Sequence, residues 1–254
     1  MSKNLTIDIG NTLVKMGLFE GMELLTVSSV KADDDLIKKS LLRAIKPDVA
    51  IVCSTASREL TRRVIDMVKP ICPIMTEVFY KTPMPIRLKY RTPETLGSDR
   101  IATAVAAWSR VQDAGEACNV LVIDCGTAIT YDLTLADGTF VGGNITPGVE
   151  MRFRALHEHT GRLPHVSGVG DVPLLGYDTE TAIRSGVMRG VVAEARDIVA
   201  EVTREHPNLK VFFTGGQGGF LYSNLKDINS EYIHDLVVEG LNRILLYNQA
   251  NENC

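Results

Sequence analysis

The amino end of the chain alternates apolar and polar residues on both sides of a short polar turn. Leu5–Ile7 leads into the turn Asp8–Thr12, and Leu13–Leu18 then alternates apolar residues with Lys15 and Gly17. A period of two is typical of a β-strand, so this pattern predicts two strands joined as an opening hairpin.

Continuous apolar runs and helical spacing follow the predicted hairpin. Val49–Cys53 is an uninterrupted apolar run, as expected of a strand that is buried on both faces. Helical spacing of apolar residues over Asp33–Ile45 and Glu59–Val68 predicts helices before and after that strand, in a βαβ-like order. The proline-rich segment 70–85 predicts an irregular connection or an edge strand, and a helix is expected to open within Thr95–Arg100.

The strand and turn of the amino end recur in the second half of the chain. Val120–Ile123 ends in Asp124–Ala128, and the alternating segment Thr130–Leu133 follows. Asp8 and Asp124 lie 116 residues apart, about the length of one modest domain. The repetition predicts an α/β fold with duplicated halves, residues 1–115 and residues 116–254.

Further patterns in the second half predict three helices and one strand. Helical spacing covers residues around Val149–His157, Thr179–Thr203 and Leu236–Tyr247. Val211–Thr214 is typical of a strand, and the glycine turn Gly215–Gly216 ends it.

Composition and charge narrow the class of protein. With 254 residues, of which 45% are hydrophobic, the chain can bury a sizeable core. A net charge of −4 gives no attraction to phosphate polymers, so no nucleic-acid partner is expected. No apolar run approaches the roughly 20 residues that cross a bilayer, and the amino end lacks the pattern of an export signal. We expect a cytoplasmic protein without a membrane partner, whose scattered cysteines are free thiols: Cys53, Cys72, Cys118, Cys125 and Cys254.

Both Asp-x-Gly turns suit a bound nucleotide. Glycine lets the backbone approach a phosphate and turn with positive φ, amides and a Thr hydroxyl donate hydrogen bonds, and the carboxylate reaches a hydrated Mg²⁺. Either turn alone is best explained as a structural turn, in which Asp8 or Asn11 closes an Asx-type hydrogen bond. Two copies favour a function, since duplication is expected to bring both turns to one cleft. The Gly-x-x-x-x-Gly-Lys-[Ser/Thr] loop is absent, which disfavours a P-loop fold.

Two neighbouring features leave alternatives open. Lys15 is either a point charge for a phosphate or a lysine solvated on the hairpin. Thr214–Gly216 either brings its backbone close to a nucleotide or forms a structural turn.

Four motifs carry a resemblance that covers nearly the whole chain. They are Asp8–Lys15, Leu96–Ala102 with its Gly-x-Asp-Arg, Asp124–Asp132, and Gly142–Gly148 with its Gly-Gly-x-Ile-x-Pro-Gly. The chain resembles the type III pantothenate kinases, members of the sugar-kinase, heat-shock-protein-70 and actin superfamily. The resemblance implies duplicated ribonuclease-H-like (actin-like ATPase) domains with a nucleotide cleft between them, and a homodimer.

The resemblance also implies an activity and a set of site residues. The reaction would be ATP-dependent phosphorylation of pantothenate to 4'-phosphopantothenate, the first step of coenzyme A biosynthesis. Asp99 would be the general base, Asp124 would bind a monovalent cation (K⁺ or NH₄⁺), and Mg²⁺ would accompany ATP. The residues that would contact ATP are Asp8, Ile9, Gly10, Asn11, Thr12, Leu13, Val14, Lys15 and Thr127. Those that would contact pantothenate are Tyr90, Gly97, Ser98, Asp99, Arg100 and Thr179.

Each acceptor-site residue also has a structural explanation. In a loose transition state a carboxylate of ordinary pKa, ~3.9, suffices to accept the alcohol's proton late, and Arg100 suits a substrate carboxylate. Otherwise Asp99 is a helix N-cap and Arg100 a surface residue. Without the resemblance, Tyr90 is a packing residue and Thr179 a helix cap.

Two other functions remain open on the same fold. One is a non-catalytic accessory factor in transcription, against which the intact aspartates and Thr127 argue. The other is a different superfamily enzyme, such as a sugar kinase or an exopolyphosphatase, against which only Gly97–Arg100 and Tyr90 argue. The match is weakest at Thr214–Gln217, which lacks the acidic residue common there, and at His165–Gly170, which does not align.

Overall fold

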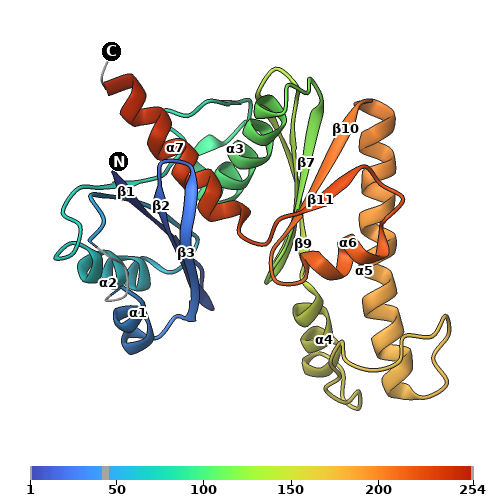
Figure 1. Cartoon of the computed structure of the whole chain (residues 1–254). Coiled ribbons are helices and arrows are strands. Elements are labelled where there is room, and N and C mark those ends of the chain that lie inside the picture. The colour runs from blue at the N-terminus through green and yellow to red at the C-terminus, as the bar shows by residue number, and fades with distance from the viewer. Residues whose placement is uncertain (1, 42–45, 253–254) are drawn as a thin grey trace. The chain divides into compact units, whose positions relative to one another are not determined.

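The computed structural model describes residues 2–41 and 46–252, and its α/β architecture contains two sheets (Figure 1). The chain divides into two compact units. Unit 1 comprises Met1–Glu116, Asp137–Val141 and Asp235–Cys254, and unit 2 comprises Ala117–Ala136 and Gly142–His234.

Unit 1 contains a five-stranded sheet with the order β3-β2-β1-β4-β5. Its strands are β1 (Lys3–Ile9), β2 (Leu13–Glu20), β3 (Glu23–Lys31), β4 (Val49–Ser54) and β5 (Met75–Glu77). β1 pairs antiparallel with β2, placing Asp8 opposite Lys15, and parallel with β4. The predicted opening hairpin is therefore confirmed.

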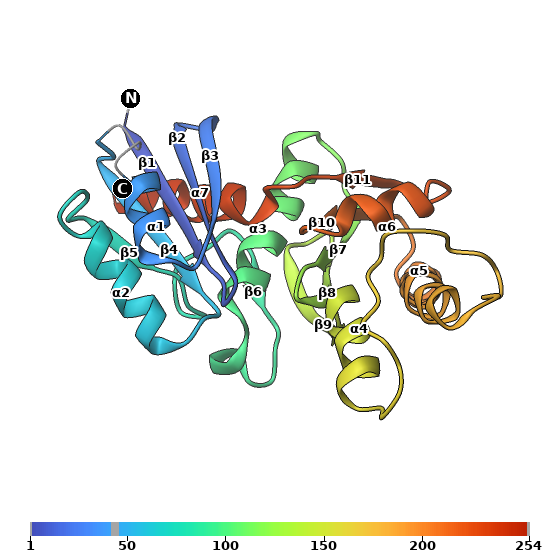
Figure 2. The same ribbon diagram turned by 90° about the horizontal axis from the view of Figure 1, so that it is seen from below.

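Helices cover both faces of this sheet (Figure 2). α1 (Asp34–Leu41) and α2 (Arg58–Val68) lie on one face, and α3 (Ser98–Asp113) and α7 (Leu236–Glu252) on the other. Along β4, Val49, Ile51 and Cys53 belong to the α3–α7 core, whereas Ala50 and Val52 belong to the α1–α2 core. The strand is buried on both faces, as its continuous apolar run predicted. Residues 42–45 of the first predicted helix lie outside the described residues, as does Cys254.

Unit 2 repeats the strand order of unit 1. Its strands are β7 (Asn119–Cys125), β8 (Ala128–Thr134), β9 (Thr139–Pro147), β10 (Leu209–Thr214) and β11 (Ser230–Tyr232), in the order β9-β8-β7-β10-β11. As in unit 1, the central strand pairs antiparallel with the next strand in sequence and parallel with the fourth. β6 (Arg87–Leu88) pairs with Thr139 and Phe140, the first residues of β9, which belong to unit 1. The helices are α4 (Val149–Glu158), α5 (Thr179–Glu205) and α6 (Gly218–Asn224).

The repeated topology confirms the predicted duplication. α6 connects β10 and β11 as α2 connects β4 and β5. α7 comes from the second half of the sequence but packs in unit 1 against α3. The division into contiguous halves at residues 115 and 116 stays a prediction.

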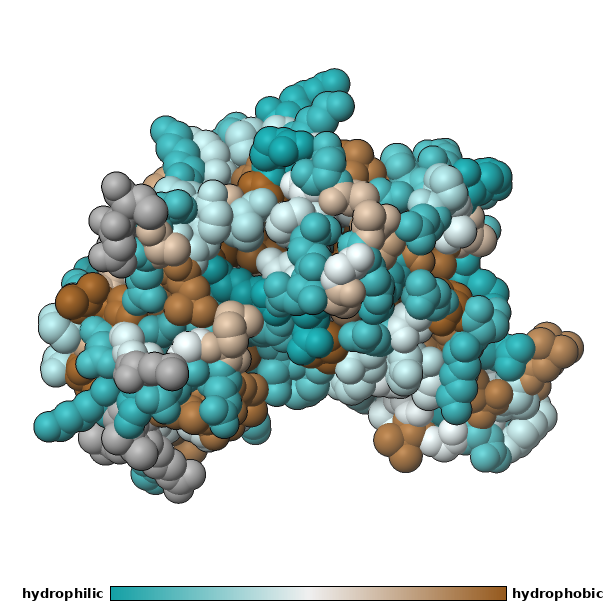
Figure 3. Space-filling view, turned by 45° about the horizontal axis from the view of Figure 1, so that its top comes forward, coloured by the Kyte–Doolittle hydropathy of each residue, from teal (hydrophilic) through white to brown (hydrophobic). Residues whose placement is uncertain are grey.

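The surface mixes polar and apolar side chains. On the face drawn in Figure 3, hydrophobic residues form separate patches among hydrophilic ones. In the part of the chain that the structure describes, no helix combines the length and apolar character needed to span a membrane. The four described cysteines, Cys53, Cys72, Cys118 and Cys125, are buried free thiols, as predicted.

Candidate active site

Asp8 lies near the end of β1 in unit 1, on the side of the strand that carries polar residues. Leu5, Ile7 and Ile9 point into the α1–α2 core, so Asp8 lies on the opposite side of the strand. The thiol of Cys53, at the end of β4, donates a hydrogen bond to Asp8 Oδ1 at 3.3 Å. Burial, and then the negative charge of Asp99, raise the pKa of Asp8 to about 6, although Cys53 and Lys15 oppose the shift.

Asp99 lies in the first turn of α3. Ser98 fixes this helix start, because its hydroxyl donates to Ser54 O at 3.3 Å and accepts from Ser54 N at 3.2 Å. The helix N-cap is Gly97, so the alternative that Asp99 is the N-cap is wrong. Burial raises the pKa of Asp99, while the Arg100 backbone amide, 2.8 Å from Asp99 Oδ1, and the Arg100 charge counteract it. Both carboxylates therefore have a raised pKa, and the Asp99 charge contributes to the shift of Asp8.

Arg100 is buried, with 6% of its surface exposed, so the alternative that it is a surface residue is wrong. Its guanidinium carbon lies 5.9 Å from the centre of the Tyr90 ring. Tyr90 packs against the α3–α7 core and contacts Phe140, with 6.2 Å between the ring centres. Tyr90 is therefore a packing residue whose ring also faces the Arg100 guanidinium.

Lys15 is held rather than freely solvated. Its ammonium group lies 3.2 Å from Asp235 Oδ1, and only 15% of its side chain is exposed. The alternative of a solvated hairpin lysine is therefore wrong. Asp235 directly precedes α7, and no local sequence pattern pointed to this partner.

The turn after β1 closes through its backbone. Gly10 N donates to Leu13 O at 2.9 Å, and the Asn11 side chain adds a hydrogen bond from its Nδ2 to Thr55 O at 3.3 Å. Neither Gly10 nor Gly126 of the second turn adopts positive φ, so that part of the expectation is wrong. Gly10 instead provides space, since an added Cβ would lie 3.0 Å from Leu13 O.

The turn after β7 in unit 2 is held by two other segments. Gly148 N donates to Thr127 O at 3.0 Å, and Gln217 N donates to Cys125 O at 2.9 Å. Gly215 has φ +82°, and a Cβ there would overlap Asp124 Oδ1. The glycine turn after β10 thus lies directly against Asp124. Gly126 and Thr127 are exposed, so a ligand can approach this turn from solvent.

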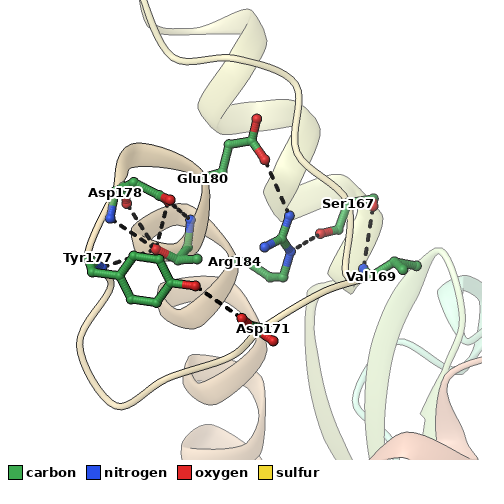
Figure 4. Close-up of polar contacts among 8 residues, drawn as sticks. Ser167, Val169, Asp171, Tyr177, Asp178, Glu180 and Arg184 are labelled. Carbon is green, nitrogen blue, oxygen red and sulfur yellow. Dashed lines mark hydrogen bonds and ion pairs between the residues drawn. The ribbon is translucent and has the colours of Figure 1, made fainter.

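Thr179 is the exposed first residue of α5. Figure 4 shows the residues around this helix start, among them Asp178, Glu180 and Arg184. The N-cap is Asp178, whose carboxylate accepts hydrogen bonds from the amide and hydroxyl of Thr181, both at 2.8 Å. The alternative that Thr179 is the cap is therefore wrong by one residue. The loop before it is held by Arg184, which donates to Ser167 O at 2.9 Å.

The structure brings the predicted residues together in separate groups. Unit 1 gathers Asp8, Lys15 and Asp99, with Arg100 following Asp99. Unit 2 places Asp124 and Thr127 on one turn, and Thr179 on another segment. Sequence reasoning missed Cys53 as a partner of Asp8, although its place at the end of a buried strand was a usable signal.

The side chains that the structure describes form no ready cage for a metal ion. Over residues 2–41 and 46–252, no three His, Cys, Asp or Glu side chains form a cluster that could hold a metal ion. A hydrated Mg²⁺ that arrives on ATP needs only one or two protein carboxylates, because phosphates and water complete its shell. Asp8 is compatible with that role.

Similarity to known proteins identifies the family of this chain. A family model described as type III pantothenate kinase matches residues 4–201. The chain belongs to the type III pantothenate kinase family. A type III pantothenate kinase from Azobacteroides pseudotrichonymphae is 40% identical over 243 residues, covering 96% of each chain. Another type III pantothenate kinase, from Phocaeicola vulgatus, is 41% identical and covers 96% of this chain and 98% of its own.

Solved structures show the fold of this type III pantothenate kinase family member. A polyphosphate/ATP-glucomannokinase from Arthrobacter has a TM-score of 0.52 at 13% identity, with 97% of this chain and 99% of that chain covered. A Campylobacter jejuni protein described as a Baf family transcriptional activator has a TM-score of 0.64 at 20% identity, with 98% and 100% covered. At these identities the likeness concerns the fold alone. The fold is the duplicated ribonuclease-H-like fold of actin-like ATPases and sugar kinases.

Proposed function

We propose that this chain transfers the γ-phosphoryl group of ATP to the primary hydroxyl of pantothenate. The product would be 4'-phosphopantothenate, in the first step of coenzyme A biosynthesis. Membership of the type III pantothenate kinase family supports the acceptor. The observation that carries the chemistry is the placement of Asp99, a carboxylate of raised pKa, next to the buried Arg100.

Asp99 is the proposed general base. Phosphoryl transfer depends mainly on positioning and on charge stabilisation, so the base needs to accept the hydroxyl proton only late. A raised pKa makes the Asp99 carboxylate a better acceptor for that proton. Ser98 supports this role by fixing the start of α3 to β4.

Arg100 is the proposed partner of the pantothenate carboxylate. Its guanidinium is largely removed from water, which strengthens pairing with an anion. The Tyr90 ring restricts the guanidinium from one side. The complete proposed acceptor set is Tyr90, Gly97, Ser98, Asp99, Arg100 and Thr179.

The proposed ATP contacts are Asp8–Lys15 and Thr127. Lys15 supplies a positive charge near Asp8, and Thr127 supplies an exposed hydroxyl. Asp8 would hold the hydrated Mg²⁺, which neutralises phosphate charge when bound. Asp124 is the proposed ligand of a monovalent cation, K⁺ or NH₄⁺. We also propose a cytoplasmic homodimer.

An acceptor screen tests this function. Purified protein is incubated with MgATP and K⁺, and ADP formation is measured with pantothenate, hexoses, small hydroxy acids or polyphosphate. We expect ADP formation with pantothenate and not with the other acceptors. Turnover of a hexose would indicate a sugar kinase, and no turnover with any acceptor would favour the non-catalytic accessory factor.

The cation requirement has its own test. Replacing K⁺ with NH₄⁺ should preserve turnover, whereas a bulky organic cation should not support it. Full turnover with the organic cation alone would remove Asp124 as a cation ligand.

A further inference from the structure

A partly buried carboxylate in unit 2, Glu194 of α5, accepts hydrogen bonds from three side chains. Its Oε1 accepts from the Tyr131 hydroxyl at 2.9 Å and from the Thr146 hydroxyl at 2.8 Å. Its Oε2 accepts from Arg152 Nη2 at 2.8 Å. These donors come from β8, β9 and α4, so one carboxylate links four elements.

The network is charged at neutral pH. Burial alone would raise the pKa of Glu194, but hydrogen bonds from Arg152, Thr146 and Tyr131 outweigh it and lower the pKa. Burial, and then the Glu194 charge, raise the pKa of Tyr131, which keeps its hydroxyl protonated as a donor. A charge-assisted hydrogen bond is roughly twice as strong as a neutral one, so Glu194 holds Arg152 firmly.

Arg152 connects this carboxylate to the second Asp-x-Gly turn. While Nη2 binds Glu194, Nε donates to Pro147 O at 2.8 Å. The next residue, Gly148, donates its backbone N–H to Thr127 O at 3.0 Å. Gly148 lies so close that an added Cβ would overlap the carbonyl oxygens of Gly126 and Thr127.

We propose that Glu194 and Arg152 are positioning residues that hold the Gly126–Thr127 turn in the conformation that binds ATP, acting through Pro147 and Gly148. This rests on the proposed role of Thr127 as an ATP contact. The planar guanidinium suits the task because two of its nitrogens bind different partners in a fixed geometry. Neither residue belongs to the sequence motifs that carried the family resemblance.

A purely structural role gives different expectations. If the ion pair only joins α4 to α5, its loss lowers the melting temperature and leaves ligand affinity unchanged. If the pair positions the turn, affinity for ATP falls while the KM for pantothenate does not change. Calorimetric titration with ATP measures the first quantity even without turnover, and steady-state kinetics measures the second.

The Glu194→Gln variant tests the charged contact. Its amide retains the side-chain shape but cannot present an anionic oxygen to both the hydroxyls and Arg152. We expect the Kd for ATP to rise at least fivefold and the KM for pantothenate to stay within twofold. Glu201→Gln is the matched control, since Glu201 lies on the same helix, is half exposed and pairs only locally with Arg204. It should change neither quantity.

The Arg152→Lys variant separates a role in positioning the turn from a role in joining α4 to α5. It also decides between these roles if Glu194→Gln does not fold. A lysine can retain the ion pair with Glu194, but its single ammonium lacks the second nitrogen that binds Pro147 O. We expect the melting temperature to stay near that of the parent while the Kd for ATP rises at least threefold. A Kd within 1.5-fold of the parent would overturn the proposal.

The parent protein separates this inference from the proposed function. If the parent binds ATP without turning over pantothenate, the proposed function fails while the Kd comparison still judges the network. If the parent does not bind ATP at all, the positioning role falls as well.

Discussion

The Asp-x-Gly turns of unit 1 and unit 2 share a sequence pattern but differ in length. Four residues separate the paired Ile9 and Val14 in the first, and three separate Cys125 and Ile129 in the second. Gly10 N therefore reaches Leu13 O, whereas Gly126 N reaches Ala128 O. The sequence order is repeated, but the backbone conformation of the turn is not.

The two turns also differ in their surroundings. Asp8 lies among charged groups and has a raised pKa due to burial and Asp99. The turn of Asp124 is instead held by backbone hydrogen bonds from Gly148 and Gln217. The first turn thus lies near a second carboxylate of raised pKa, whereas two segments distant in sequence bind the backbone of the second turn.

The largest effect is expected from Asp99→Asn in unit 1. Asparagine can accept a hydrogen bond but cannot take the acceptor's proton, so kcat should fall by about 10² to 10⁴. Binding of ATP and pantothenate should change little, and thermal unfolding should stay cooperative, because Gly97 rather than Asp99 caps the helix. Asp66→Asn, at an exposed position of α2, is the control. A kcat within a few-fold of the parent would refute the base assignment.

Removal of either turn carboxylate compares the two units directly. Asp8→Ala and Asp124→Ala should each abolish most turnover, by about 10²-fold, while the fold stays intact. Each residue is the second-last of its strand, and neither is part of the apolar core. Steady-state kinetics and thermal unfolding are measured on the same samples. Loss of cooperative unfolding in either variant would mean that the carboxylate supports the scaffold.

The raised pKa of Asp8 predicts a cost in stability. Between its ordinary value of 3.8 and about 6, the folded protein binds a proton that the unfolded chain has released. The contribution of Asp8 to the free energy of unfolding therefore falls as pH rises through this window, by at most about 3 kcal/mol. Asp8→Asn should be more stable than the parent at pH 7.5 and match it near pH 3.5.

Urea unfolding at several pH values measures this difference, with Asp66→Asn as the control. Equal stability of Asp8→Asn and the parent at pH 7.5 would contradict the electrostatic description of the first turn. An inactive but stabilised variant would instead show that Asp8 is kept for function.

The smallest effects are expected at two glycines, one in the second turn and one packed against it. Gly148→Ala should lower the free energy of unfolding by about 1 to 3 kcal/mol, because the new methyl group overlaps two carbonyl oxygens. Gly126→Ala should leave stability almost unchanged, since its nearest neighbours lie 3.7 Å from the added carbon. Its exposed methyl group should weaken ATP binding if a phosphate approaches there. If Gly148→Ala and Gly126→Ala were equally stable, the close packing of Gly148 would not support the second turn.

Sequence patterns predicted the central strands well and the outer strands poorly. The hairpin β1–β2 and the buried strand β4 follow from residues close in sequence. β3 was missed because it is an edge strand that is mostly exposed and carries no clear alternation. β9 was missed because Gly142 and Gly143 suggest a loop, although Gly143 lies against the Tyr131 carbonyl, where no side chain fits.

Sequence motifs predicted the candidate site residues, but they did not predict the burial or the partners of those residues. Burial of Arg100 depends on packing between α3 and the rest of the core, and no local pattern reports it. The partner of Lys15, Asp235, is 220 residues away and is brought near by α7. The first turn is present, but the prediction of positive φ at Gly10 was wrong. Glycine is required there because Leu13 O approaches closely, and not because the backbone is left-handed.

Because α7 packs in unit 1, the last part of unit 1 is synthesised after all of unit 2. Val237, Val238, Leu241 and Ile244 complete the core on the α3 side, yet the ribosome makes them after every residue of unit 2. A nascent unit 1 therefore carries an uncovered apolar face while unit 2 is translated, although domains generally fold in the order of synthesis. A chain that stops at His234 contains all of unit 2 but lacks the last helix of unit 1. In this protein, the domain that begins first is the one that finishes last.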